Sequence, residues 1–393
     1  MRPVIAAPPP DEEFGEIPLA EPPSLKVATP AYRAPMSVPS ASRVRAPIPP
    51  PVQSSRSYRY WLLLVVLIPL IWTTVRDRSK PQLTVQERLK QTIIHHPEAL
   101  GRLAALPEDA SESQVFAALP NDRLDGALLA KETEGHWVLA AISGVGFLAA
   151  VLLLFPAGHA KTQHLIGIAL LTGTLGILLL LAFQWLAFHM PLFHGRGYIT
   201  LLLDFVWLIG QSYRMALGDH GFVLSFLGFT AGVGFCEEVC KALPVIFKAR
   251  ATGFSSWRSA MLWGMVSGVG FGISEGITYS SDSYNGIYGA DMYWVRFVSC
   301  VGLHAIWAGA VGIAVFRSQD IFRGQMHPLE WIWRLAQVVI VPMILHGAYD
   351  TLLKEQADMY ALIVAVVSFG WLAFQIERTS RAFGDAPPEE LAA

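Results

Sequence analysis

The chain has 393 residues, of which 53% are hydrophobic and only 15% are charged, whereas charged residues make up about 25% of a typical soluble domain. Its mean hydropathy is +0.42, and its apolar residues come in long blocks that are typical of transmembrane helices. A formal net charge of −2 argues against a nucleic-acid-binding surface, and three cysteines do not make a disulfide framework. We therefore expect an all-α polytopic membrane protein.

The N-terminal part of the chain divides into a tail and a first apolar block. Residues 1–56 contain more than half of the 26 prolines, and such a composition cannot bury enough apolar surface to offset its chain entropy. We predict a disordered tail there. The apolar block Tyr60–Val75 predicts a transmembrane segment within residues 57–76, which is short for a span at about 1.5 Å of rise per residue.

A polar segment follows at residues 77–135. It contains two capping-box patterns, Thr84-Val-Gln-Glu87 and Ser111-Glu-Ser-Gln114, which predict helix starts. His95-His96 stands before a proline and is interpreted as a helix end. We expect a small helical segment outside the bilayer, without a catalytic constellation of its own.

The membrane core is predicted at residues 136–376, with a polar C-terminal tail at 377–393. We expect eight core transmembrane helices in addition to the short first one. Their predicted ranges are Trp137–Phe155, Leu165–Phe188, Tyr198–Leu217, Phe222–Phe247, Arg258–Tyr279, Tyr293–Phe316, Leu335–Leu353 and Met359–Ile376.

The distribution of Lys and Arg predicts the orientation in the membrane. Loops 248–258 and 317–334 and the C-terminal tail carry basic residues, whereas loop 280–291 carries none. We therefore place the basic loops and the C-terminus in the cytoplasm. Counting back over eight spans then puts residues 77–135 in the cytoplasm and the N-terminal tail on the far side.

Four consecutive spans carry ionisable groups, which are costly at bilayer depth and usually face a partner or a polar cavity. The motifs are Cys236-Glu237-Glu238-Val239-Cys240-Lys241, Phe271-Gly272-Ile273-Ser274-Glu275, His304-Ala-Ile-Trp307 and His346-Gly-Ala-Tyr-Asp350. A single buried ion pair or histidine has an ordinary structural explanation. Three glutamates and two histidines on four adjacent spans predict a functional polar site.

Helical spacing indicates how some of these groups pair. Glu237 and Glu238 lie four and three residues before Lys241, so either carboxylate can meet the ammonium group. Consecutive side chains diverge by roughly 100° on a helix, so one glutamate can pair with Lys241 while the other faces a cavity. His346 and Asp350 are also four residues apart, a spacing that lets the carboxylate orient the imidazole.

This ordered set of motifs resembles the PrsW family of bacterial intramembrane proteases, which is distantly similar to the CAAX prenyl endopeptidases and bacteriocin-processing membrane proteases. The resemblance covers about residues 137–376. The positions that match the family's motifs are Glu237, Glu238, Glu275, His304, His346 and Asp350. The prenyl endopeptidases have His at the place of Glu275 and Asn at the place of Asp350, so the resemblance does not extend to prenylated substrates.

The resemblance implies hydrolysis of a peptide bond in a membrane-bound regulatory protein, such as an anti-sigma factor, in the bacterial cytoplasmic membrane. We assign Glu237 as the base and then the acid, with Glu238 held by Lys241. The reverse assignment stays open, because Lys241 can reach either carboxylate. One imidazole would position the water and another would stabilise the oxyanion. Asp350 would set the tautomer of His346.

Two classes of alternative stay open. A zinc-dependent version would use the same residues, and its candidate ligands are Glu237, Glu275, His304, His346 and Asp350. Because no His-Glu-x-x-His motif is present, we favour catalysis without a metal. One non-enzymatic alternative is a transporter or proton relay, but the sequence lacks the inverted repeat that is typical of transporters. The other is a membrane scaffold that binds partners through the proline-rich tail.

Overall fold

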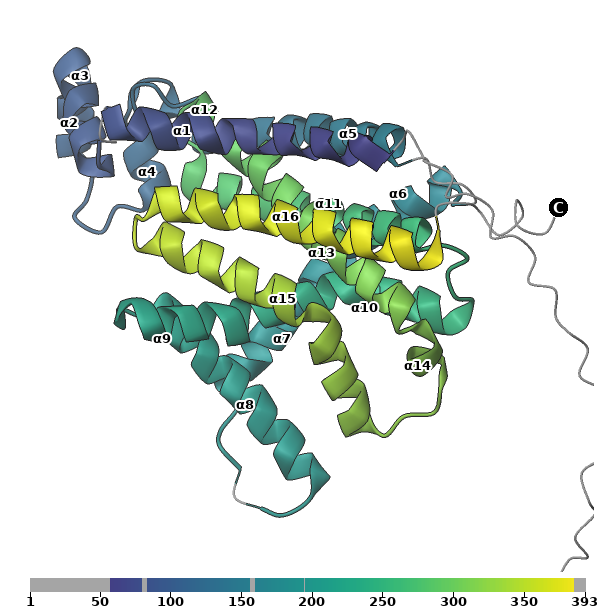
Figure 1. The fold of residues 1–393 in the computed structure, drawn as a ribbon. Helices are drawn as coiled ribbons and strands as arrows, with labels where there is room; N and C mark the ends of the chain where they lie inside the picture. Colours follow the sequence, from purple (N-terminus) through teal and green to yellow (C-terminus); the bar gives the residue numbers. More distant parts are fainter. Residues whose placement is uncertain (1–56, 80–82, 156–159, 194, 385–393) are drawn as a thin grey trace, which may run out of the picture. The chain divides into compact units, whose positions relative to one another are not determined.

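The computed structural model describes residues 57–79, 83–155, 160–193 and 195–384 (Figure 1). The predicted disordered tail and the last residues, 385–393, lie outside the described residues. Within the described ranges the chain is helical and contains no β-strand, which confirms the all-α prediction.

The helices are α1 (Ile68–Ser79), α2 (Val85–His95), α3 (Glu98–Ala104), α4 (Glu112–Ala117), α5 (Gly135–Leu154), α6 (Thr162–Leu171), α7 (Ile177–His189), α8 (Tyr198–Leu217), α9 (Gly221–Gly228), α10 (Phe235–Ala251), α11 (Trp257–Tyr279), α12 (Ala290–Trp294), α13 (Val301–Arg317), α14 (Gln319–Arg323), α15 (Pro328–Lys354) and α16 (Asp358–Phe383).

Seven continuous helices in the described part are long and apolar enough to cross a membrane. Short π-helical turns join α6 to α7, α9 to α10 and α12 to α13, and another extends α11. These seven correspond to seven of the eight predicted core spans. Their bounds are Gly135–Leu154, Thr162–His189, Gly221–Ala251, Trp257–Tyr284, Ala290–Arg317, Pro328–Lys354 and Asp358–Phe383.

The remaining predicted span forms the helix α8 over the predicted residues, but α8 is not among the seven. Its polar side chains attach it to neighbouring backbone: Asp204 Oδ1 accepts from the Phe193 N–H at 3.1 Å, and Arg214 Nη2 donates to the Phe188 carbonyl at 2.8 Å. These polar residues lower the hydropathy of α8 and hold it against the end of α7.

The short N-terminal span is longer than its residue count suggested, because it begins as a 3-10 helix (Ser57–Leu67) before continuing as α1. With a rise of about 2.0 Å per residue in the first part and about 1.5 Å in the second, Tyr60–Arg76 extends about 30 Å. This matches the hydrocarbon core of a bilayer. At the junction, the Ser299 hydroxyl donates to the Val66 carbonyl at 2.6 Å and accepts from the Leu70 N–H at 3.3 Å. The hydroxyl thus replaces an interrupted helical hydrogen bond.

The polar segment, residues 83–134 as described, contains α2, α3 and α4. Both predicted capping boxes are present, at Thr84 and Ser111, and α2 ends at His95 as expected. Phe116, Leu119 and Leu124 form a small apolar core together with Ile287, which belongs to the loop after α11.

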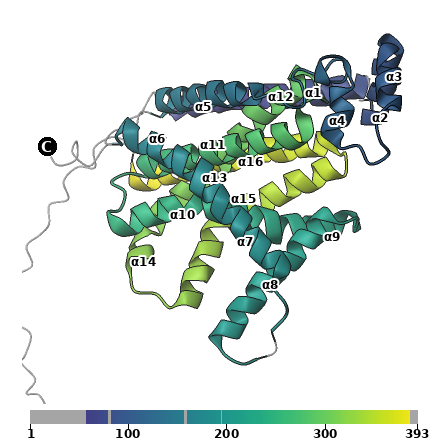
Figure 2. The same ribbon diagram turned by 180° about the vertical axis from the view of Figure 1, so that it is seen from behind.

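Backbone hydrogen bonds fix the polar segment to that same loop, although the predicted topology placed the two on opposite sides of the membrane. The Leu124 N–H donates to the Gly286 carbonyl at 2.8 Å, and the Gly286 N–H donates to the Leu129 carbonyl at 2.9 Å. Figures 1 and 2 show α2, α3 and α4 at one end of the helix bundle and the last turn of α16 at the other.

The eight predicted crossings put the start of α5 and the end of α16 on one side, whereas in the structure these two points lie at opposite ends of the bundle (Figure 1). Seven helices that can cross, without α8, fit this arrangement. The N-terminal helix agrees: Arg76 pairs with Asp291 at the end that carries the polar segment, and the Tyr60 hydroxyl donates to Glu377 Oε1 at 2.9 Å at the other end.

Helices α11 and α13 form the centre of the bundle and pack closely through glycines. A Cβ atom at Gly264 would lie 2.1 Å from the Ala308 carbonyl oxygen, and one at Gly268 would lie 2.2 Å from the His304 carbonyl oxygen. Small residues allow two helix backbones to approach this closely. The resulting contact fixes the height of His304 relative to α11.

Candidate active site

The glutamate pair of α10 is held by the lysine one turn further on. Lys241 Nζ lies 2.7 Å from Glu238 Oε1 and 3.8 Å from Glu237 Oε2, and all three side chains are buried. The Phe271 ring lies 4.7 Å from the same ammonium group. As the helical spacing predicted, Lys241 pairs closely with one of the two glutamates and lies farther from the other. Glu238 is the closely paired carboxylate, and Glu237 Oε2 has no hydrogen-bond partner.

His346, on α15, presents its two ring nitrogens to different carboxylates. Nδ1 lies 3.1 Å from Glu238 Oε1, whereas Nε2 lies 3.3 Å from Asp350 Oδ2 and 3.6 Å from Glu237 Oε2. The Trp307 ring stacks on the imidazole with a centroid distance of 4.4 Å. Asp350 therefore lies on the Nε2 side of the ring, while Glu238 is the group that engages Nδ1.

His304, on α13, lies between a cation and a carboxylate. Its Nδ1 lies 2.9 Å from Lys241 Nζ, and its Nε2 lies 2.7 Å from Glu275 Oε2. Because an ammonium group has no lone pair, Nδ1 must accept this hydrogen bond. The proton of the neutral imidazole is then on Nε2, facing Glu275.

The structure also brings Arg296 into this cluster, a residue that sequence reasoning did not select. It lies in the π-helical turn Val295–Cys300, and its Nη2 is 2.8 Å from Glu275 Oε1. The guanidinium is buried and lies 4.2 Å from the centre of the Tyr279 ring. The sequence did contain a signal for it, because this arginine lies inside the predicted span Tyr293–Phe316, where a charge is costly.

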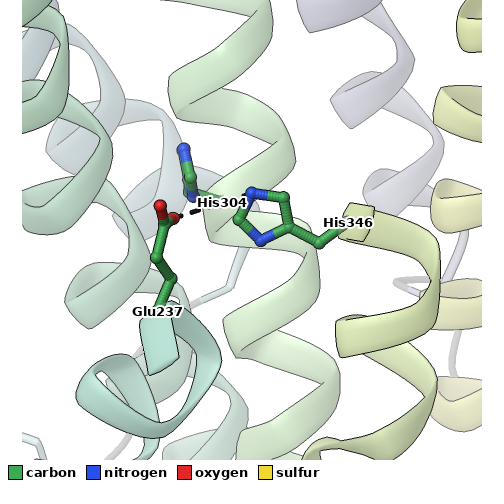
Figure 3. Close-up of side chains that lie close together, drawn as sticks. All are labelled: Glu237, His304 and His346. Carbon is green, nitrogen blue, oxygen red and sulfur yellow. Dashed lines mark ion pairs between the residues drawn. The ribbon is translucent and has the colours of Figure 1, made fainter. Parts of the chain in front are cut away.

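Glu237, His304 and His346 converge from α10, α13 and α15, as Figure 3 shows. One ligand atom from each side chain lies within 4.8 Å of the others, and all three residues are buried. Two imidazoles and one carboxylate are a ligand set found in catalytic zinc sites. The unpartnered Glu237 Oε2 fits this chemistry, because a cation would satisfy it.

Glu275 and Asp350, which the sequence analysis included among candidate ligands, lie outside this group of three. Each instead approaches one of the imidazoles, and they are the most exposed of the six predicted site residues, at 19% and 24% of their side chains. The six residues thus form one connected cluster. It contains a buried inner part that could hold a metal ion and two carboxylates nearer to its open side.

The comparisons with known proteins agree with this arrangement. The family profile described as PrsW family intramembrane metalloprotease matches residues 161–373, more than half of the chain, and this range contains every residue of the cluster. No curated protein and no solved structure matches the chain. The chain belongs to the PrsW family and is a multi-pass intramembrane protease.

Proposed function

We propose that this protease hydrolyses a peptide bond of a membrane-bound regulatory protein at a metal site formed by Glu237, His304 and His346. The observation that carries the proposal is the convergence of these three side chains within 4.8 Å, with a further carboxylate beside each imidazole. A carboxylate that accepts from a ligating histidine is the usual support of a zinc ligand. The family's description as a metalloprotease supports this version over the metal-free one that we favoured from sequence.

A zinc ion bound there would supply Lewis-acid activation of water and of the substrate carbonyl. The residues of the chain have separate tasks. Glu238 orients His346 through Nδ1. Glu275 orients His304 through Nε2, so His304 would hold the ion through Nδ1, in exchange for its present contact with Lys241. Lys241 would remain paired with Glu238 and neutralise it. Asp350 is the carboxylate left to take a proton from the attacking water and to pass it to the amine nitrogen as the C–N bond breaks.

The position of the cluster supports a bond near the membrane surface as the target. His346 lies eight residues before the end of α15, or about 12 Å at 1.5 Å per residue. That end of the bundle is the one that carries the polar segment, and the partly exposed Glu275 and Asp350 lie toward it. We therefore expect cleavage of single-span proteins close to the surface on that side, as for an anti-sigma-factor-like regulator.

The test uses the purified protein, reconstituted with candidate single-span proteins. Glu237→Gln and His304→Ala should reduce cleavage by about 10² or more and should lower the bound zinc. The matched control is Glu330→Gln, because Glu330 is on the same helix as His346 but is exposed and paired only with Arg334. It should cleave and bind zinc like the unmodified protein.

Activity that persists after exhaustive chelation would overturn the metal version and restore Glu237 as the water-activating base. Normal cleavage by both site variants would overturn the site itself.

A further inference from the structure

Arg296 is a buried cation that forms one ion pair within the described part of the chain. Its Nη2 is 2.8 Å from Glu275 Oε1, and its guanidinium lies over the Tyr279 ring. A buried charge is retained only with a partner, and here the partner is a residue of the candidate active site.

The two oxygens of Glu275 are divided between two neighbours. Oε1 faces Arg296 and Oε2 faces His304 Nε2 at 2.7 Å. Because a carboxylate is a rigid planar group, an ion pair at one of its oxygens restricts where the other oxygen can lie. Arg296 therefore sets the direction from which Glu275 meets the imidazole.

We propose that Arg296 is a positioning residue that holds the ring of His304 in its working orientation through Glu275. The inference rests on the proposed function only where it takes His304 to be needed for catalysis. The contacts of Arg296, Glu275 and His304 do not depend on that function. It predicts that Arg296 affects the site only as long as Glu275 is present to transmit the effect.

The helix that carries Arg296 is anchored by residues outside the range that matches the family. Asp291, one turn earlier, pairs with Arg76 of the N-terminal helix. The Tyr293 hydroxyl donates to Asn285 Oδ1 at 2.7 Å, and Asn285 Nδ2 donates to the Thr133 carbonyl at 3.3 Å. These contacts give Arg296 a fixed support from which to orient Glu275.

The first test is a double-mutant cycle with Arg296→Met, Glu275→Gln and their combination, measured as kcat and KM. Removing a supporting residue of this kind typically costs about 10- to 100-fold, and we expect that loss in kcat for Arg296→Met, with KM unchanged. In the Glu275→Gln background the same change should cost less than about 2-fold, because the two residues act as one unit. An equal loss in both backgrounds would overturn the proposal.

Two further variants separate positioning from folding. Arg296→Lys keeps a cation that can reach one carboxylate oxygen and can lie over Tyr279, so it should recover most of the lost kcat. Arg317→Met is the matched control, because Arg317 ends the same continuous helix and donates to Gln375 at 3.2 Å, away from the cluster. The stability of each variant is measured alongside kcat, and if Arg296→Met folds poorly, Arg296→Lys, which leaves Glu275 paired, takes its place in the cycle.

The second test needs neither substrate nor cleavage, so it separates this inference from the proposed function. Nitrogen-15 NMR of the His304 ring should show one tautomer with the proton on Nε2 in the unmodified protein and in Arg317→Met. In Arg296→Met the tautomer should stay, because Lys241 still faces Nδ1, but the Nε2–H resonance should shift as the contact with Glu275 Oε2 is lost. An unchanged His304 spectrum in Arg296→Met would overturn the proposal whether or not a substrate has been found.

Discussion

Lys241 has the most demanding electrostatic position among the residues of the site. Its ammonium group is fully buried and lies within 3 Å of both Glu238 Oε1 and His304 Nδ1. It therefore joins the glutamate pair to the histidine of a neighbouring helix. Removing one member of a buried ion pair leaves the other charge uncompensated, which is more costly than replacing both.

We predict that Lys241→Met lowers the free energy of unfolding by about 3–5 kcal/mol. The combined variant Lys241→Met with Glu238→Gln should be less destabilised than Lys241→Met alone, because no lone carboxylate remains. Reversible unfolding in mixed micelles measures both. A double variant that is as unstable as the sum of the two single variants would show that the pair is not energetically coupled.

Asp350 provides a second prediction at this scale, because its oxygen faces His346 Nε2 and not Nδ1. If Asp350 transfers the proton, Asp350→Asn should lose about 10²–10⁴ in rate and keep its zinc, whereas His346→Ala should lose both. If Asp350 only orients the ring, the amide oxygen of Asn should preserve partial activity. Metal content measured alongside kcat distinguishes the two roles.

At the scale of the helices, the site depends on the contact between α11 and α13. The Gly268 backbone lies against the carbonyl group of His304. The contact that packs the two helices together therefore also sets the position of His304 along the axis of α13. A side chain added there would meet backbone, which cannot move aside as a flexible side chain does.

We predict that Gly268→Ala lowers both stability, by about 1–3 kcal/mol, and kcat, because the displaced α13 backbone carries His304 away from Glu275. Gly167→Ala is the control, since a Cβ atom at that position has nothing within 4 Å. It should fold and cleave normally. A Gly268→Ala variant with unchanged kcat would mean that the cluster tolerates a shift of α13.

At the scale of the whole described chain, we predict that the seven apolar helices all cross the membrane, which would place the polar segment and the end of α16 on opposite sides. Together with the cytoplasmic C-terminus predicted from Lys and Arg, this topology predicts that the polar segment lies outside the cytoplasm. The same prediction extends to the open side of the site, because Glu275 and Asp350 lie toward the polar segment.

Cysteine labelling can test this arrangement, because two of the three native cysteines are buried and the third is partly buried. A membrane-impermeant thiol reagent should label Ile94→Cys in intact spheroplasts and Phe383→Cys only after permeabilisation; both positions are exposed, at 74% and 53%. Labelling of both from one side would contradict the seven-crossing topology. If Phe383→Cys is labelled in intact spheroplasts and Ile94→Cys only after permeabilisation, the seven-crossing topology holds but the C-terminus is not cytoplasmic.

The sequence by itself determined the features that depend on neighbours along the chain. Helical periodicity and capping patterns gave the positions of most helices, including the starts at Thr84 and Ser111, since each turn is closed by groups three or four residues apart. The same spacing predicted that Lys241 pairs with the glutamate motif. The cost of charge in a bilayer was enough to select the six candidate site residues, which the structure brings into one cluster.

Only the tertiary structure decided which nitrogen faces which carboxylate, because this depends on the relative height of helices that are distant in sequence. Close backbone contacts such as that at Gly268 set those heights, and no local pattern encodes them. Arg296 was missed because its partner Glu275 lies on another helix, so no local motif connects it to the site. The crossing count failed at α8 for the same reason: hydropathy describes one segment, whereas the contacts of Asp204 and Arg214 with the backbone around α7 decide where that segment lies.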